Sequence, residues 1–188
     1  AGERHARPLP GFDCGNSPAE VLGQPLTGRT LIHTTHAGTQ GLAAAARSAD
    51  RVFTGAFVNA AATVEAIRAL APSEVTVVAM GHEAREPCLE DELCAELLCA
   101  RLRGDRVGAS GHDAAGRDSD GRDAYGLDPG RLADRLRAAP AAAKFFDPAA
   151  TWAPEADFAL CAALDAVPFA VSLGRSDEGW SELRRWSA

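Results

Sequence analysis

An alternation of apolar runs and helical patterns is the sequence feature that most limits how this chain can fold. Three times, a β-favouring apolar run leads into a small polar turn and then into a segment whose apolar residues have helical spacing. The apolar runs cover residues 30–35, 51–58 and 74–80, and the helical segments cover residues 40–49, 60–71 and 88–103. Parallel strands joined by crossover helices produce this rhythm. We therefore predict an α/β fold with a largely parallel sheet.

Boundary signals support the predicted helices. Val64, Ile67 and Leu70 share one face of the second helix, with Asn59 as its N-cap and Pro72 as its stop. The third helix has an apolar stripe made of Leu89, Leu93, Leu97 and Leu98. Further elements are expected as a helix over 129–139, a helix over 154–164 and a strand over 168–173.

Length and charge exclude several classes of protein. A chain of 188 residues can bury one core, or form two small similar lobes that share one. The formal net charge of -7, without a cluster of Lys and Arg, argues against a nucleic-acid surface. No stretch reaches the roughly 20 apolar residues of a membrane span. Five cysteines without a Cys-x-x-Cys pair predict free thiols, and therefore a cytoplasmic protein.

The composition changes between residues 104 and 130, where Gly, Asp and Arg dominate. We interpret this stretch as a flexible connection within a single domain that spans residues 1–188. Its Asp118-x-Asp120 pair superficially matches an aspartyl-phosphate or calcium loop. Gly121 stands in the wrong place for either, so a solvated acidic loop is the favoured interpretation.

Two short polar loops look suited to holding an anion: residues 11–18, called the first loop, and residues 34–41, called the second loop. Glycines let backbone N–H groups turn toward a ligand, hydroxyls add donors, and a helix is expected to begin at the end of each loop. Each loop by itself also fits an ordinary turn and helix start, with Ser17 as N-cap and Pro18 at the first helical position.

Other candidate residues follow the ends of the predicted strands. Asn59 and His82 stand there together with the second loop, and Glu90 and Asp91 open the next predicted helix. Ligands bind outside the carboxyl ends of parallel strands, so these groups are expected to converge. Taken singly, Asn59 fits a helix cap, His82 a turn residue, and Glu90 with Asp91 a first turn that complements the helix dipole.

Several known phosphate motifs are absent. The sequence has no Gly-x-x-x-x-Gly-Lys-[Ser/Thr] loop and no Gly-x-Gly-x-x-Gly, and no cysteine is followed by the Arg of a Cys-x5-Arg phosphatase motif. Arg4-His5 resembles the start of histidine phosphatases, but those enzymes place the motif after a first strand. A thiol-phosphate route is therefore not supported.

Taken in order, the motifs resemble the 2-phosphosulfolactate phosphatase family. They are Gly-Phe-Asp-x-Gly-Asn-Ser-Pro from Gly11, Thr-Thr-x-Ala-Gly-Thr-Gln-Gly from Thr34, Gly-Ala-Phe-Val-Asn-Ala from Gly55 and Glu-Asp-Glu-x-Cys-Ala-Glu from Glu90. The resemblance continues through 145–148, 157–158 and 168–169. It implies a three-layer α/β/α fold and a magnesium-dependent hydrolase that converts 2-phospho-3-sulfolactate to 3-sulfolactate, a step toward coenzyme M.

The resemblance also marks individual positions. These are Gly2, Glu3, Arg4, Asp13, Asn16, Ser17, Thr34, Thr35, Gly38, Thr39, Asn59, Glu90 and Asp91. Our hypothesis is metal-assisted hydrolysis of a small phosphorylated anion, with Mg²⁺ held by Asp13, Glu90 and Asp91. Hydroxyl and N–H groups of the two loops would cradle the phosphate, and Arg4 would pair with an acidic group of the substrate. A carboxylate or His82 would orient the attacking water.

Family members usually begin with a segment of roughly 65 residues containing Asp-Val-x-Arg-Ala, a length that would bring the chain to ordinary domain size. That motif does not occur in this sequence, so the domain is expected to be N-terminally incomplete. Two alternatives stay open: a non-catalytic anion-binding or regulatory domain, and a phosphatase for another small phosphorylated hydroxy acid. The sequence leaves the oligomeric state open, a homo-oligomer included.

Overall fold

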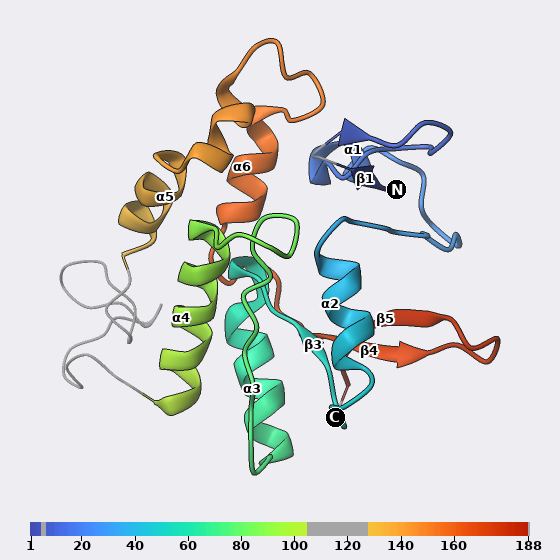
Figure 1. Cartoon of the computed structure of the whole chain (residues 1–188), viewed down its shortest axis with the longest axis vertical. Helices are drawn as coiled ribbons and strands as arrows, with labels where there is room; N and C mark the ends of the chain where they lie inside the picture. The colour runs from blue at the N-terminus through green and yellow to red at the C-terminus, as the bar shows by residue number, and fades with distance from the viewer. Residues whose placement is uncertain (5–6, 105–127, 188) are drawn as a thin grey trace.

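The computed structural model describes residues 1–4, 7–104 and 128–187. Short helices dominate the arrangement (Figure 1). The helices are α1 (Pro18–Leu22), α2 (Gly38–Ala45), the 3-10 helix η1 (Phe57–Asn59), α3 (Ala60–Leu70), α4 (Leu89–Arg103), α5 (Pro129–Arg137), the 3-10 helix η2 (Pro140–Phe146) and α6 (Glu155–Ala162). The strands are β1 (Glu3–Arg4), β2 (Arg7–Pro8), β3 (Phe53–Thr54), β4 (Val171–Arg175) and β5 (Ser181–Arg185).

The predicted parallel sheet is wrong, and so are the three layers and the two similar lobes that went with it. The strands form an antiparallel pair, β1 with β2, and a three-stranded antiparallel sheet in the order β3-β4-β5. Among the described residues, parallel pairing is limited to an isolated bridge between Gly2 and Thr34. The two sheets differ in size and surroundings, so they are not repeats of one lobe.

Backbone pairing explains the error. Residues 74–80 belong to no strand or helix, and within the described chain no backbone hydrogen bond joins them to another segment. Val75 and Val78 remain 42% and 65% exposed. β-propensity specifies an extended backbone, whereas a sheet also needs a neighbouring strand in register. The sequence pattern indicates a preference for extended backbone, but it contains no information about a neighbouring strand.

The helical part of the prediction is confirmed. α2, α3, α4, α5 and α6 overlap the five segments expected to be helical. The apolar stripe of α4 is buried at Leu93, Leu97 and Leu98, as the spacing predicts. The expected connection over 104–130 lies, except for its ends, outside the described residues.

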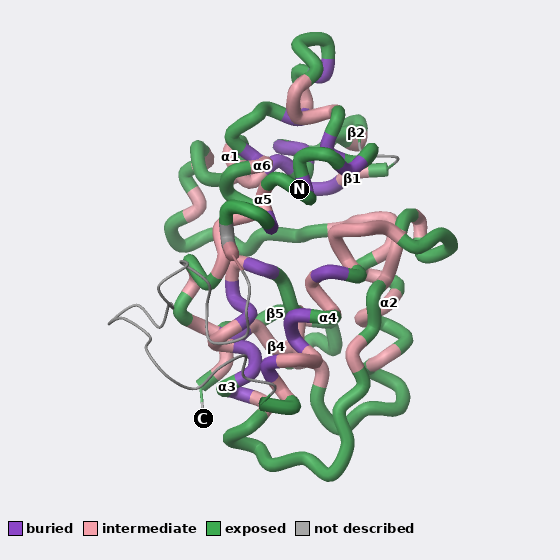
Figure 2. The backbone as a smooth tube through the Cα atoms, turned by 90° about the vertical axis from the view of Figure 1, so that its left-hand side faces the viewer, coloured by how far each residue is buried: buried purple, intermediate pink, exposed green. Residues whose placement is uncertain are grey.

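The main core lies between α3 and α4 and extends to α5. Its buried members are Phe57, Ala60, Val64, Leu93, Leu97, Leu98, Leu132 and Leu136. Figure 2 shows a second group of buried positions where the N-terminus meets α1 and α6. The first predicted anion loop contributes Cys14, Gly15 and Ser17 to this group, whereas residues 34–41 of the second loop are partly or fully exposed.

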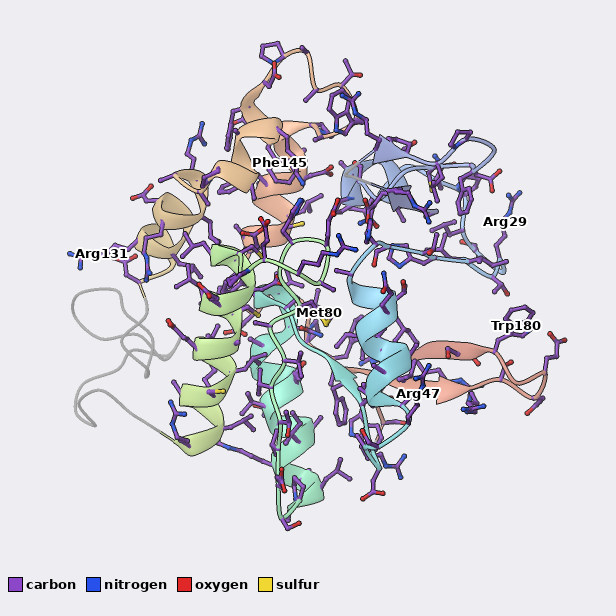
Figure 3. All side chains as sticks on the ribbon, in the orientation of Figure 1. Arg29, Arg47, Met80, Arg131, Phe145 and Trp180 are labelled. Carbon is purple, nitrogen blue, oxygen red and sulfur yellow. The ribbon has the colours of Figure 1, made fainter. Side chains whose placement is uncertain are left out.

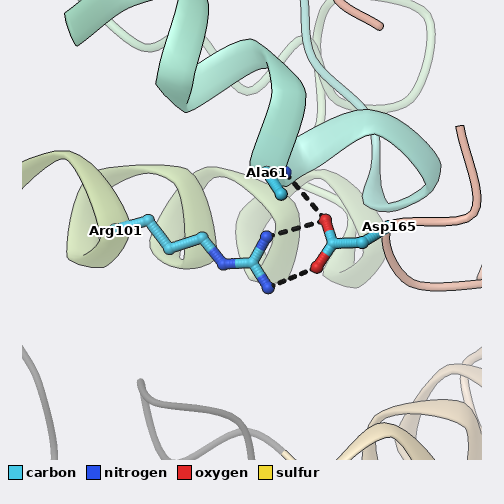
Figure 4. A network of polar contacts seen from close by, with 3 residues as sticks. All are labelled: Ala61, Arg101 and Asp165. Carbon is cyan, nitrogen blue, oxygen red and sulfur yellow. Dashed lines mark hydrogen bonds and ion pairs between the residues drawn. The ribbon is translucent and has the colours of Figure 1, made fainter. Parts of the chain in front are cut away.

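An ion pair locks the start of α3 to α4 (Figure 4). The guanidinium of buried Arg101 donates to both carboxylate oxygens of Asp165, at 2.8 Å and 2.7 Å. Oδ1 of Asp165 also accepts from the N–H of Ala61 at 2.7 Å. A carboxylate that is 104 residues away along the chain therefore caps α3.

No helix among the described residues has the length and apolar character needed to cross a membrane.

Candidate functional site

The N-terminal residues join the two predicted anion loops. The N–H of Gly2 donates to the carbonyl of Cys14 in the first loop, at 3.3 Å. On the second loop, the N–H of Thr34 donates to the carbonyl of Ala1 at 3.2 Å, and the N–H of Glu3 donates to the carbonyl of Thr34 at 3.3 Å. Two loops that are separated in the sequence therefore flank one short backbone segment.

A side-chain contact also links the two loops. Nε2 of His33, just before the second loop, lies 2.6 Å from Oδ1 of Asn16, so a ring N–H donates to the amide oxygen. Desolvation lowers the pKa of His33, which favours the neutral ring. The side chain of Asn16 is exposed beside this contact, where a ligand would have access to it.

In the first loop, the chain itself satisfies the donors at the start of α1. Ser17 is 6% exposed; its hydroxyl donates to Oδ1 of Asp157 at 2.9 Å and accepts from the N–H of Glu20 at 3.1 Å. The N–H of Ala19 also donates to Asp157, at 2.9 Å, and that of Gly15 donates to Oε2 of Glu20, at 2.9 Å. Because a hydroxyl has one proton, Ser17 cannot also donate to a phosphate in this geometry.

In the second loop, two threonines shape the entry into α2. Oγ1 of Thr35 accepts from the N–H of Thr39 at 3.3 Å, and the hydroxyl of Thr39 donates to the carbonyl of Thr35 at 2.7 Å. Gly38 begins α2 beneath the Thr35 hydroxyl. The N–H of His36 donates to Oε1 of Glu3 at 2.9 Å, so a carboxylate already lies against this loop.

A tight turn precedes α4 and carries His82. Gly81 has a φ of +70°, and its Cα faces the carbonyl oxygen of Glu86 so closely that no Cβ would fit. Its N–H donates to Oδ2 of Asp91 at 2.7 Å, which ties the turn to the first turn of α4. The N–H of His82 donates to the carbonyl of Glu86 at 2.7 Å, and the His82 side chain is exposed.

Packing links this turn to the second loop. Gly41 of α2 lies against the side chain of Met80, so closely that a Cβ on Gly41 would collide with the sulfur. Figure 3 shows Met80 between α2 and the helices α3 and α4. A continuous series of contacts therefore runs from the first loop through the N-terminus and the second loop to the turn at Gly81 and to Asp91.

The remaining candidates are distributed around this series. Arg4 on β1 and Asp13 in the first loop are exposed, and Glu90 is partly buried beside Asp91. Asn59 is 5% exposed and structural: its Oδ1 accepts from the N–H of Ala56 at 2.9 Å and its Nδ2 donates to the carbonyl of Thr54 at 3.3 Å.

Asn59 stands at the N-cap position, as predicted, but its side chain does not cap α3. Asp165 fills that role instead. His5, on which the comparison with histidine phosphatases depends, lies outside the described residues.

The three carboxylates expected to bind magnesium, those of Asp13, Glu90 and Asp91, do not form one cluster. In the part of the chain that the structure describes, no three His, Cys, Asp or Glu side chains are grouped closely enough to hold a metal ion together. Asp13 therefore does not join Glu90 and Asp91 in this arrangement. Glu90 and Asp91 are consecutive in the first turn of α4, so their side chains leave the helix in different directions.

Three of the five cysteines, Cys88, Cys94 and Cys161, are poorly suited to act as nucleophiles. All five are free thiols. Burial raises the pKa of Cys88 and that of Cys94 to about 11, with the charge of Asp91 adding to both shifts. Burial also raises the pKa of Cys161. These thiols are protonated at neutral pH, which agrees with the absence of a Cys-x5-Arg motif.

Sequence reasoning missed the role of Asp157. In the sequence it stands out only as part of the Asp-Phe pair at 157–158 that resembles the family. In the structure it is 2% exposed, and its carboxylate accepts a hydrogen bond from Ser17 at the end of the first loop. An acidic residue in the first turn of a helix is common, because it complements the helix dipole. The partner from the first loop, which makes Asp157 unusual, could be found only in three dimensions.

Comparison with known proteins identifies the family of this chain. The family model described as 2-phosphosulpholactate phosphatase matches residues 1–174. A relative from Deinococcus radiodurans, named "Probable 2-phosphosulfolactate phosphatase", is 42% identical over 85 residues, which are 45% of this chain and 35% of the relative. A relative of the same name from Thermus thermophilus is 40% identical over 85 residues, 45% of this chain and 36% of the relative.

A third relative of that name, from Synechococcus sp. (strain RCC307), is 40% identical over 98 residues, 52% of this chain and 39% of the relative. The matched stretches thus span little more than a third of these relatives. The chain belongs to the 2-phosphosulfolactate phosphatase family, as the match over residues 1–174 shows.

Proposed function

We propose that this chain is a magnesium-dependent phosphomonoester hydrolase, and that it releases phosphate from 2-phospho-3-sulfolactate. The observation that carries the proposal is the joining of the two loops through the N-terminal residues, with the Asn16–His33 contact of 2.6 Å between them. Family membership and the names of the relatives support the reaction type and the substrate.

The exposed groups of the joined loops would bind the phosphate. Asn16 and the partly exposed hydroxyls of Thr34 and Thr35 can donate hydrogen bonds to its oxygens, and charge that develops there is best stabilised by donors already fixed in place. Arg4, exposed on β1 beside these loops, would pair with a carboxylate or sulfonate of the substrate. Such a site favours a small anion rather than a nucleic acid.

The donor set on α4 fits magnesium. This ion takes one or two carboxylates and completes its shell with water and substrate oxygens. Glu90 or Asp91 would hold it, whereas Asp13 lies apart from this pair and is not proposed as a ligand of the same ion. When bound, magnesium would neutralise charge on the phosphate oxygens. His82, exposed on the turn that Asp91 fixes, would orient the attacking water.

We also propose that the protein works in the cytoplasm. The support is chemical: all five cysteines are free thiols, which is the usual state in a reducing compartment.

Substitution of Asp91 tests the proposal. Asp91→Asn should lower magnesium-dependent phosphate release from 2-phospho-3-sulfolactate by about 100-fold or more, since a charged ligand is lost. Glu92→Gln is the matched control, because Glu92 is exposed in the same helical turn and should be dispensable. Normal turnover in Asp91→Asn would contradict the metal assignment. Phosphate binding without turnover in the unmodified protein, under saturating magnesium, would favour the non-catalytic alternative.

A further inference from the structure

Asp157 is a buried charged residue to which the proposed reaction gives no role. It is 2% exposed and lies in the first turn of α6. Its Oδ1 accepts from the hydroxyl of Ser17 and from the N–H of Ala19, both at 2.9 Å. These partners are 140 and 138 residues away in the sequence. A buried carboxylate is costly unless it is well bonded, so its partners indicate what it stabilises.

The surroundings of Asp157 explain why the charge is tolerated. It lies in the first turn of α6 and against the first turn of α1, so the positive ends of two helices face it. Ser17 is held at both ends of its hydroxyl, since the proton goes to Asp157 and the oxygen accepts from the N–H of Glu20. The Ser17 side chain is therefore fixed in one orientation.

The first loop is therefore held by hydrogen bonds to two different parts of the chain. Asp157 holds its exit into α1, while the bond from Gly2 to Cys14 and the contact of Asn16 with His33 hold it against the second loop. Asn16, the exposed donor of this loop, is the immediate neighbour of Ser17 in the sequence. A shift of Ser17 would therefore move Asn16 away from the second loop.

We propose that Asp157 is a positioning residue of the phosphatase site. It acts through Ser17, holds the first loop in place beside the second, and does not itself touch the substrate. The inference rests on the proposed function, because the loops must bind phosphate for their placement to matter. It changes the role of Ser17 from a phosphate donor to the link between Asp157 and the donors next to it.

Four variants of the full chain test this inference: Asp157→Ala, Asp157→Asn, Ser17→Ala and, as a control, Asp147→Ala. Asp147 is exposed, and its Oδ1 accepts from the nearby N–H of Ala149 at 2.9 Å, so it resembles Asp157 without reaching the first loop. KM and kcat are measured for 2-phospho-3-sulfolactate, with the dissociation constant of inorganic phosphate from calorimetry. The folded fraction is measured by circular dichroism.

Misplaced donors should weaken binding, so Asp157→Ala and Ser17→Ala should each raise KM and the dissociation constant about tenfold. Asp157→Asn keeps an oxygen acceptor and should recover most of that loss, while Asp147→Ala should behave as wild type. A purely structural role would reduce the active fraction and leave KM unchanged. If Asp157→Ala does not fold, the KM and the dissociation constant measured for Ser17→Ala test the positioning role instead.

The two proposals fail in different ways. Active wild type together with an unchanged KM in Ser17→Ala or in folded Asp157→Ala overturns the positioning role alone. Wild type that neither hydrolyses the ester nor binds inorganic phosphate overturns the proposed function, and the positioning role with it. Wild type that binds phosphate without turnover overturns the proposed hydrolase activity. The dissociation constants of phosphate for the variants then still test the positioning role of Asp157.

Discussion

Carboxylates accept hydrogen bonds from backbone N–H groups at four places in the candidate site, one of which is the contact of Asp157 with Ala19. Glu20 accepts from Gly15 in the first loop, Glu3 accepts from His36 at the second, and Asp91 accepts from Gly81 in the turn before α4. Each loop that the sequence marked as an anion site therefore does bind an oxyanion, supplied by the chain itself. The physical preference of turned-out N–H groups for negative oxygen is the same for a carboxylate as for a phosphate.

The pKa of Cys88 reports the charge of Asp91. Burial raises this pKa to about 11, and the negative charge of Asp91, which also accepts a hydrogen bond from the thiol, contributes to the rise. In Asp91→Asn the pKa of Cys88 should fall, so at about pH 8.5 the thiolate fraction should rise about tenfold for each unit of the fall. The rate at which iodoacetamide labels Cys88, followed by peptide mass spectrometry, measures this change.

Glu96→Gln serves as the control for this labelling, because Glu96 is exposed further along α4. The same labelling rate in Asp91→Asn and wild type would contradict the contact between Cys88 and Asp91.

At the scale of the elements, helix ends are stabilised by residues distant in sequence. α1 receives Asp157 from α6, and α3 receives Asp165 from the segment after α6. Asp165 has a φ of +56°, a left-handed conformation that short polar residues tolerate best. Local capping rules therefore predict where the helices start. At α1 and α3, carboxylates from distant parts of the sequence accept hydrogen bonds from N–H groups of the first turn.

Replacement of Asp165 should destabilise the α3–α4 pair. Asp165→Asn keeps the shape and tolerates the left-handed backbone, but leaves the buried Arg101 guanidinium without this negative charge. We expect the free energy of unfolding to fall by about 2–3 kcal/mol, measured by urea denaturation. Glu182→Ala, which removes an exposed partner of Arg184, should leave it unchanged within error. Equal stability of Asp165→Asn and wild type would show that the ion pair contributes nothing.

At the scale of the whole molecule, helix packing rather than a large sheet supplies the core. The core cluster draws its buried side chains from η1, α3, α4 and α5, and the three-stranded sheet lies beside it (Figure 1). The two joined loops lie away from this cluster, near the N-terminus, α1 and α6, whereas Glu90 and Asp91 begin α4, which belongs to the core. The placement of the two loops therefore depends on residues outside the core, whereas the placement of Glu90 and Asp91 depends on a core helix.

Leu97 tests the core. It is 3% exposed between α3 and α4, and Leu97→Ala should lower the free energy of unfolding by about 2–5 kcal/mol, because the substitution leaves a cavity. Leu22→Ala is the control, since Leu22 is 73% exposed and should tolerate truncation. Urea denaturation followed by circular dichroism compares the two. Similar losses in both variants would mean that Leu97 does not belong to a well-packed core.

The helices, the apolar stripe of α4 and the glycine-bearing loops follow from local sequence, because these features depend on neighbours within a few residues. The sequence also carried the family motifs from Gly11 to Glu90. Strand pairing depends on contacts between distant segments, and the structure has two small antiparallel sheets where a parallel sheet was expected.

Tertiary structure likewise joined the first loop to the second, left Asp13 apart from Glu90 and Asp91, and assigned Asp157 to Ser17. Strand pairing and buried carboxylate contacts connect residues far apart in the chain, and local pattern contains no information about such partners.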